Sequence, residues 1–374
     1  MGRIFKVDGA SKLSPSYLPL ELPHREQHIQ ELLKIFSPLL EREKQIPWAI
    51  MIQGPSGTGK TSVVRAFFRA ISNIASERGI KIITNIINCR FMKSDFSLAQ
   101  AIALSVMPSV SLRGFSATEM IQNVMEYLRN NESYLILALD DFDSYTIRKK
   151  SKLKLVYDIL KQQEIIDSRL FIIFIGVSDY TLMFEESWIR NYVWRTKSKF
   201  EPYSWSELKD ILGKRAKEVF KDGVVDESEL IFVSRISSKF GYGSARYGLE
   251  LLLISGMEAE WEGNNKINSE HIRLSLAKLE GEQEAAEFSN FSEDLREFAL
   301  ALAEVFEEED ISYLTLSSLL SRLKKEKQKT MEYLNRLNLE GIVDLLEFGG
   351  DVYIGLFLPS KLISLMKQRD DTLT

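Results

Sequence analysis

The chain has 374 residues, of which 45% are apolar and 27% are charged. These fractions are typical of a folded protein with more than one domain, and they exclude wholesale disorder and fibrous repeats. Its 48 basic and 53 acidic residues leave a net charge of −5, which excludes coating of nucleic acid by bulk charge. The single cysteine, Cys89, cannot close an intrachain disulfide, and the apolar runs are too short to span a membrane. We therefore expect a cytoplasmic protein whose DNA contacts, if it has them, are local.

The first half of the chain alternates strand-like apolar runs with helical periodicity, which is the pattern of a parallel sheet covered by crossover helices. We expect strands over residues 48–53, 81–87, 134–140 and 169–177. Helices are expected over residues 62–76, 98–106, 118–130 and 152–163. A capping box formed by Ser116 and Glu119 predicts where the third of these helices begins.

The second half has helical periodicity, beginning at a capping box of Ser204 and Glu207. Helices are predicted over residues 226–240, 244–262 and 269–279, followed by a polar linker at 280–287. The last part predicts helices near 292–305, 315–321 and 326–339 and then strands at 342–346 and 352–356. We therefore expect an α/β P-loop domain with a parallel sheet at 1–203, a helical lid at 204–283 and a winged helix-turn-helix domain at 284–374.

A phosphate-binding motif follows the first predicted strand. The sequence matches G-x-x-x-x-G-K-[ST] in full and precedes a helical run, as a P-loop requires. Lys60 is expected between the β- and γ-phosphates, and the Thr61 hydroxyl is expected as a ligand of Mg²⁺. The whole predicted loop comprises Gly54, Pro55, Ser56, Gly57, Thr58, Gly59, Lys60, Thr61 and Ser62. The motif predicts ATP or ADP together with Mg²⁺ as cofactors.

Two carboxylates end the strand predicted at 134–140, as in a Walker B strand. Asp140 is expected to hold Mg²⁺ through its water shell, and Asp141 to polarise the attacking water. Most ATPases of this kind use Glu at the second position. Asp reaches about 1.5 Å less far, which predicts slow hydrolysis without loss of binding.

The chain resembles the AAA+ ATPases of the archaeal origin-recognition family, relatives of the eukaryotic origin recognition complex and its cell-division-control partner. The likeness begins at residues 17–26, where the family's Arg-Glu pair opens a helix beside the adenine pocket, which implies that Arg25 lies near the nucleotide. Residues 174–179 are similar to the family's first-sensor strand. There Ser178 is a candidate sensor, and Asp179 replaces the usual Asn. An acid near a triphosphate is repelled, so this departure also predicts slow turnover and a nucleotide that acts as a switch.

The resemblance extends into the lid. Residues 200–203 and Arg215 are similar to the family's lid entry, which implies Tyr203 and Arg215 as nucleotide-side residues. Gly243-Ser-Ala-Arg246 resembles the second-sensor motif, whose arginine bridges to the γ-phosphate and couples nucleotide state to the lid. Arg190 and Arg195 both lie where an arginine finger is expected, and the sequence does not choose between them.

The predicted helix at 326–339 lies in a locally basic stretch, although the chain as a whole is acidic. Met331, Leu334 and Leu337 are expected to face the core, while the start of the helix projects toward base edges and phosphates. The DNA-binding candidates of this helix region are Lys325, Lys327, Gln328, Lys329, Thr330 and Arg336. In the family that the chain resembles, an inserted helix of the ATPase domain also contacts DNA, which implies Arg90, Lys93 and Arg113 as further candidates. Acidic Glu347 and Asp351 flank the predicted wing tip and disfavour a wing that contacts phosphates.

The resemblance implies an ATP-binding initiator that recognises double-stranded origin DNA and helps to place the replicative helicase, alone or with other initiator subunits. It also implies a slow ATPase located at the nucleoid. Two alternatives from other classes stay open: a transcription regulator whose DNA affinity is tuned by ATP, and a signalling or transposition-associated ATPase whose winged domain binds protein. A small-molecule P-loop kinase is disfavoured, because nothing in the sequence resembles an acceptor-substrate site.

Overall fold

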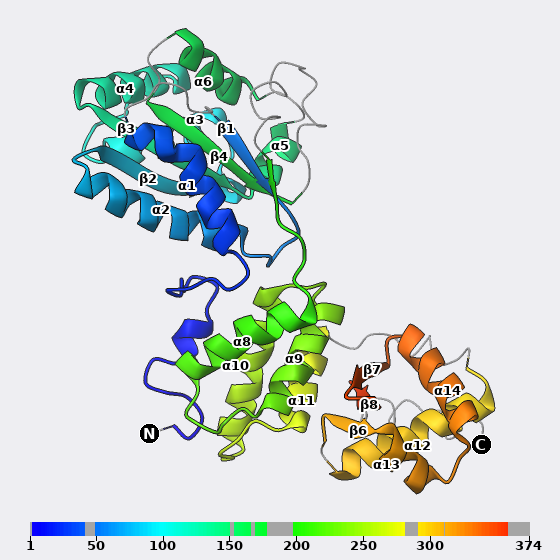
Figure 1. The fold of residues 1–374 in the computed structure, drawn as a ribbon. Helices are drawn as coiled ribbons and strands as arrows, with labels where there is room; N and C mark the ends of the chain where they lie inside the picture. The colour runs from blue at the N-terminus through cyan, green and yellow to red at the C-terminus, as the bar shows by residue number, and fades with distance from the viewer. Residues whose placement is uncertain are drawn as a thin grey trace. The chain divides into compact units, whose positions relative to one another are not determined.

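The computed structural model describes residues 2–41, 49–149, 153–165, 169–177, 197–280, 291–309 and 311–357. The chain divides into two compact units, and each is described by itself (Figure 1). One unit is Leu18–Pro202; the other combines the residues up to Tyr17 with those from Tyr203 onward. The chain thus passes between the units twice, and its N-terminal segment belongs to the unit that contains the lid. The expected division into three domains, at 1–203, 204–283 and 284–374, remains a prediction.

The first unit contains a five-stranded parallel sheet of order β2-β3-β4-β1-β5. Its strands are β1 (Ala49–Gln53), β2 (Lys81–Asn88), β3 (Ser133–Asp140), β4 (Leu170–Gly176) and β5 (Lys197–Lys199). The four predicted strands are confirmed, and all seven residues of β4 are buried, which explains its continuous apolar run. The edge strand β5 was missed, because its Lys-Ser-Lys sequence has no strand-like pattern.

Helices cover both faces of this sheet (Figure 1). Side chains of α1 and α2 form one core with the sheet, and those of α3, α4, α5 and α6 form the other. The bounds are α1 (Glu26–Leu40), α2 (Lys60–Glu77), α3 (Asp95–Val106), α4 (Ala117–Asn130), α5 (Phe142–Lys149) and α6 (Lys154–Ile165), with a short 3₁₀ helix η2 (Cys89–Phe91) after β2. The capping box of Ser116 and Glu119 is confirmed at the start of α4. Because all five strands are parallel, the loops that follow them start at one edge of the sheet, where α/β proteins bind ligands.

The second unit begins with the helical lid. It contains α8 (Trp205–Val219), α9 (Glu227–Lys239), α10 (Ala245–Trp261) and α11 (Ser269–Glu280), and the predicted capping box of Ser204 and Glu207 starts α8. The N-terminal segment, with its 3₁₀ helix η1 (Ala10–Leu13), packs on these helices: Phe5 pairs with Phe220, and Ile4 is fully buried. These contacts explain why residues up to Tyr17 belong to this unit.

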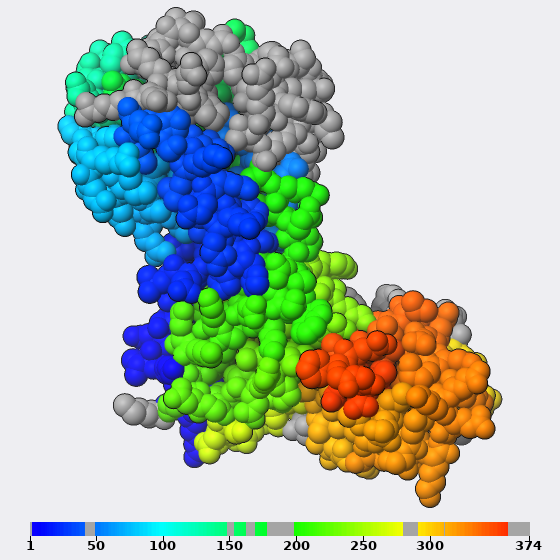
Figure 2. Space-filling view, in the orientation of Figure 1, coloured from blue at the N-terminus to red at the C-terminus, as the bar shows by residue number. Residues whose placement is uncertain are grey.

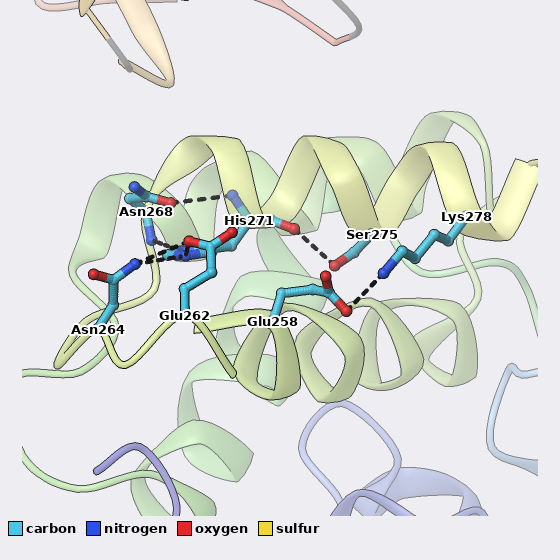
Figure 3. Close-up of polar contacts among 7 residues, drawn as sticks. All are labelled: Glu258, Glu262, Asn264, Asn268, His271, Ser275 and Lys278. Atoms are coloured by element: carbon cyan, nitrogen blue, oxygen red, sulfur yellow. Dashed lines mark hydrogen bonds and ion pairs between the residues drawn. The ribbon is translucent and has the colours of Figure 1, made fainter. Parts of the chain in front are cut away.

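The corner between α10 and α11 is held by polar side chains (Figure 3). The Asn268 side chain accepts a hydrogen bond from the His271 backbone N–H at 3.1 Å, and His271 Nδ1 accepts one from the Asn268 backbone N–H at 3.0 Å. The ring proton therefore lies on Nε2, which is 3.0 Å from Glu262 Oε2. An ion pair joins Lys278 to Glu258 at 2.7 Å. The reciprocal Asn268–His271 pair is a capping box in which a histidine replaces the usual acid.

The C-terminal part of the second unit has the predicted order of a winged helix. Its elements are α12 (Glu293–Glu309), β6 (Tyr313–Thr315), α13 (Leu316–Leu323), α14 (Lys327–Leu339), β7 (Val343–Phe348) and β8 (Asp351–Leu356). The three strands form an antiparallel sheet of order β6-β8-β7, and the three-residue β6 was missed. Gly349 and Gly350 turn the β7–β8 hairpin with φ of 62° and 87°, values that favour glycine at both positions. Among the described residues, no helix has both the length and the apolar character that crossing a membrane requires.

Candidate nucleotide site and DNA-binding helix

The loop between β1 and α2 has the backbone of a phosphate cradle. Gly54, Gly57 and Gly59 have φ of 153°, 78° and 90°, a range that other residues rarely adopt. A Cβ on Gly54 would lie 2.2 Å from the Phe200 carbonyl oxygen, so only glycine fits there. The loop leads directly into α2, an 18-residue helix whose N-terminus attracts anions. The predicted P-loop therefore has the conformation that its chemistry needs.

Two side chains of the loop make contacts within the loop itself. Lys60 Nζ donates to the carbonyl oxygens of Gly54 at 2.6 Å and Pro55 at 2.7 Å, which holds the ammonium group across the loop. The buried Thr58 donates its hydroxyl to the Pro55 carbonyl at 2.8 Å. Thr58 Oγ1 thus helps to fold the loop, and the contribution of Thr58 to a phosphate site would come from its backbone.

The two predicted magnesium ligands lie side by side. Thr61 Oγ1 donates a hydrogen bond to Asp140 Oδ2 at 2.9 Å, although the residues are 79 positions apart. Burial raises the pKa of Asp140 above its ordinary value, and the neighbouring charge of Asp141 adds to this, while the Thr61 hydrogen bond and Lys60 oppose it. A hydroxyl and a carboxylate are hard oxygen donors that suit Mg²⁺, so this pair fits the ion that the motif implies.

Asp141 is held in an unusual backbone conformation, with φ of 50°. Its backbone N–H donates to Asp140 Oδ1 at 3.0 Å, and Asn88 Nδ2 donates to its Oδ2 at 3.2 Å. Asn88 ends β2 and lies opposite Asp140 in the β2–β3 register. It is a site residue that the sequence interpretation missed. The available signal was a polar residue at the carboxyl end of a strand in the same sheet.

Arg25 is buried behind the P-loop. Its Nε donates to the Thr58 carbonyl at 3.0 Å, its Nη2 donates to the Glu201 carbonyl at 2.9 Å, and its guanidinium carbon lies 5.3 Å from the centre of the Phe200 ring. The structure therefore brings Arg25 to the P-loop backbone, and its predicted place beside the nucleotide stays a prediction. These contacts are made with the loop backbone and with the segment that leaves the sheet after β5, so they support the loop from behind.

Four of the predicted residues, Ser178, Asp179, Arg190 and Arg195, lie outside the described residues. The last described position before the first-sensor residues is Val177, whose backbone N–H donates to Asp143 Oδ2 at 2.9 Å. Asp143 lies in α5, directly after the Walker B acids. The end of β4 is therefore tied to the end of β3 by a side chain.

The predicted nucleotide-side residues of the lid lie in the second unit. Tyr203 is buried, and its backbone N–H donates to the Gly243 carbonyl at 3.1 Å, which joins the start of the lid to the second-sensor loop. Arg246 is exposed in the first turn of α10. Arg215 is buried with its guanidinium 4.9 Å from the centre of the Tyr17 ring, and burial lowers its pKa. Arg215 thus anchors the N-terminal segment on the lid, and its assignment to the nucleotide stays a prediction.

The start of α14 presents the predicted basic surface with one correction. Lys325, Lys327, Gln328 and Lys329 are all exposed. Thr330, in contrast, is only 1% exposed, so the prediction that it projects toward DNA is wrong. The reason is helical spacing, because Thr330 lies four and seven positions before Leu334 and Leu337, which are buried in the core.

Some of these basic groups already contact neighbours in the chain. Lys329 Nζ lies 3.4 Å from Asp294 Oδ2, and its hydrogen bonds with Tyr333 and then Asp294 raise its pKa. Arg336 pairs with Glu340 at 2.8 Å. Exposed pairs of this kind contribute about 0–1 kcal/mol, so phosphates can compete for the cations. Arg113 and Lys93 are exposed in the loops that flank α3, and Arg90 is exposed in η2.

Comparison with known proteins identifies the chain. Residues 21–173 match the AAA ATPase domain, and residues 209–276 match the Cdc6 AAA+ ATPase-type lid domain. The chain is 31% identical to ORC1-type DNA replication protein 2 of Saccharolobus solfataricus, over 96% of this chain and 91% of that protein. It belongs to the ORC1-type DNA replication protein family. The protein of the same name from Sulfurisphaera tokodaii is 27% identical over 90% of this chain and 85% of its own length.

Solved structures agree with the fold of this ORC1-type chain. Cdc6p of Pyrobaculum aerophilum has a TM-score of 0.81 at 22% identity, over 98% of this chain and 99% of that one. The ORC1 protein of Aeropyrum pernix, solved in complex with DNA, has a TM-score of 0.66 at 23% identity, over 98% of each chain. The domain matches end at residue 276, so the winged helix rests on α12–α14 with the β6–β8 sheet and on these structural similarities.

Family membership confirms the expected α/β AAA+ fold class and the resemblance to the archaeal origin-recognition family. The chain is an AAA+ protein that binds adenine nucleotide and acts in DNA replication as an initiator. The comparisons favour this reading over the regulator and signalling alternatives. The roles of the individual site residues, the bound Mg²⁺ and the protein partners remain matters for proposal.

Proposed function

We propose that this ORC1-type protein is a nucleotide-switched binder of double-stranded origin DNA, and that it helps to recruit the replicative helicase together with other initiator subunits. The observation that best supports nucleotide binding is the direct Thr61–Asp140 hydrogen bond beside a P-loop whose glycines have positive φ angles. The relative solved as ORC1 in complex with DNA supports the DNA half. Bound nucleotide would set which conformation of the chain is populated.

In this proposal, each group of the nucleotide site has one role. Lys60 and the loop amides bind the phosphates, while Thr61 and Asp140 hold Mg²⁺, which when bound would neutralise phosphate charge. Asp141 would accept a proton from the attacking water. Asn88 donates a hydrogen bond to one Asp141 oxygen, and the Asp141 side chain is shorter than the glutamate usual at this position. For both reasons we expect the protein to hydrolyse ATP slowly. Ser178 would sense the γ-phosphate, Asp179 would be repelled by it, and Arg246 would report the γ-phosphate to the lid.

The DNA surface in this proposal is the exposed start of α14. Lys325, Lys327 and Lys329 would contact phosphates, and Gln328 would reach base edges. Further contacts are assigned to Arg336 and to Arg113 in the loop before α4. Affinity built on such contacts falls as salt rises, because each phosphate contact releases counterions.

An origin-footprinting experiment with and without ATP tests the proposal. The native protein is expected to protect a defined origin segment with ATP, and Lys60→Ala to lose both ATP binding and the ATP-dependent part of the protection. Lys81→Ala is the matched control, because Lys81 is an exposed lysine at the start of β2, away from the loop. Equal retention of ATP by Lys60→Ala would refute the nucleotide assignment.

Genome-wide occupancy tests the second candidate, a transcription regulator tuned by ATP. The slow hydrolysis expected from the Asp141 contacts favours this reading, since a regulator needs ATP as a signal rather than as fuel. Enrichment at origins supports the initiator. Occupancy confined to promoters would support the regulator instead.

A further inference from the structure

A buried carboxylate lies where the winged-helix part of the second unit meets the lid. Asp344, in β7, is 4% exposed. Arg235 of lid helix α9 donates from Nε to Asp344 Oδ2 at 2.6 Å and from Nη2 to Oδ1, which makes a two-pronged ion pair. Tyr313 of β6 donates its hydroxyl to Asp344 Oδ2 at 2.9 Å. Three elements that are far apart in sequence therefore converge on one carboxylate.

Contacts around this ion pair continue the junction on the same helix. Lys239, one turn after Arg235 in α9, donates from Nζ to the Val343 carbonyl at 3.2 Å and lies 5.1 Å from the centre of the Phe357 ring. Phe357, just past β8, stacks on Phe232 with ring centres 5.9 Å apart. Figure 2 shows atoms of the β7–β8 hairpin, in red, directly against the green surface of the lid. The junction thus has both a polar and an apolar part.

A second lid helix contacts the neighbouring part of the winged helix. Arg273 of α11 is buried and donates to the carbonyl oxygens of Leu356, at 3.3 Å, and Ile311. The buried hydroxyls of Ser269 and Ser312 are 2.7 Å apart. Helices α9 and α11 therefore contact the same end of the β6–β8 sheet, where β6 and β7 begin and β8 ends.

Such a junction is specific to one orientation. Apolar surfaces tolerate sliding, but a buried carboxylate is stabilised only where its cation and hydroxyl partners meet it. Rotation of the winged helix on the lid would separate Asp344 from Arg235 and leave both groups poorly solvated. A polar pair in this position favours one arrangement over the alternatives, as buried polar groups do where they specify register.

We propose that Asp344 and Arg235 are positioning residues that lock the winged helix onto the lid, so that α14 moves with the lid as one body. The consequence for DNA rests on the proposed function: a nucleotide-driven movement of the lid would then carry the DNA-binding helix with it. Neither residue contacts nucleotide or DNA in this proposal. Their effect is on orientation alone.

Distance measurements between spin labels test the lock directly in the full-length protein. Lys217→Cys on α8 and Glu308→Cys on α12 place labels at exposed positions of the lid and the winged helix, while native Cys89 is buried. The native pair is expected to give one narrow distance distribution, and Asp344→Asn a broad or double one. Lys266→Gln, which breaks an exposed 2.9 Å ion pair with Asp226 inside the lid, is the control and is expected to change nothing. An unchanged distribution in Asp344→Asn overturns the proposal.

A milder variant guards against misfolding of Asp344→Asn. Tyr313→Phe removes one hydrogen bond to Asp344 and leaves the ion pair in place. It is expected to broaden the same distribution to a smaller extent. If Asp344→Asn does not fold, an unchanged distribution in both Tyr313→Phe and Arg235→Gln overturns the lock.

DNA binding provides the second readout. We expect Asp344→Asn to reduce the ratio of origin-DNA affinity with ATP to that with ADP by about tenfold, which is 1.4 kcal/mol of coupling, while its ATP affinity stays within twofold of native. A residue that only stabilised the fold would not separate these two quantities. An unchanged ratio overturns the coupling. If the native protein shows no difference between ATP and ADP, the proposed function fails, and the label distances still decide the lock.

Discussion

Replacement of Arg25 by alanine distinguishes support of the P-loop from contact with the nucleotide. The side chain makes charge-assisted hydrogen bonds to the carbonyl oxygens of Thr58 and Glu201 and lies over Phe200. Hydrogen bonds to a charged group contribute about 1.5–3 kcal/mol each. Loss of both is expected to lower the free energy of unfolding by about 3–6 kcal/mol in the absence of nucleotide.

Urea denaturation without nucleotide, followed by calorimetric titration of ATP, measures the two effects separately. If Arg25 supports the loop, Arg25→Ala unfolds at lower urea and also binds ATP more weakly, because the Thr58 carbonyl is no longer held. Arg78→Ala is the control, since Arg78 is exposed at the end of α2. Weakened ATP binding with an unchanged free energy of unfolding would refute the structural role and place the guanidinium on the nucleotide.

Four further predictions concern single groups. Burial raises the pKa of Asp140, so this carboxylate is expected to take up its proton at a pH above about 3.9, the pKa of an ordinary aspartate. Mg²⁺-dependent ATP binding is therefore expected to weaken already above that pH as the solution is acidified. Asp140→Asn is expected to abolish this pH dependence in titrations. Thr330→Val is expected to be neutral or stabilising in thermal unfolding and to leave DNA affinity unchanged, because Thr330 Oγ1 is buried and has no hydrogen-bond partner among the described residues. Weaker DNA binding would contradict its buried placement. Lys327→Ala is expected to reduce the salt slope of DNA affinity by about 1 in filter binding, and an unchanged slope would exclude a phosphate contact. His271→Ala is expected to cost about 1 kcal/mol in chemical unfolding through loss of the α11 cap, and no change would show that the cap is not stabilising.

The parts of the fold that could be predicted from sequence are those whose signal is local. Strand β4 is a continuous buried apolar run, and helix α14 has buried residues at helical spacing, so both patterns are visible in the local sequence. Strands β5 and β6 have only three residues each and form by pairing with strands elsewhere in the sequence. Their formation depends on partners that a local pattern does not contain.

The same distinction applies to the nucleotide site. The P-loop is one continuous segment, so its residues were predicted together. Asn88, in contrast, reaches Asp141 only because β2 pairs with β3 in the register that sets Asn88 opposite Asp140. Thr330 was assigned to the DNA surface from the basic residues around it, although helical spacing places it with Leu334 on the buried face. Composition around a residue was a poorer guide than its position on the helix.

The contacts of Arg25 and Asp344 together indicate how a change at the P-loop could travel along the chain. Arg25 joins the Thr58 carbonyl to Glu201, one residue before Pro202, where the first unit ends. Displacement of Thr58 would therefore strain the same guanidinium that holds the segment leading into the lid. On the other side of that connection, the Asp344–Arg235 pair allows a lid movement to reach α14 without being absorbed at the junction. Asp344→Asn is therefore expected to change coupling while ATP binding is kept, whereas Arg25→Ala weakens ATP binding through the loop and Lys60→Ala removes it.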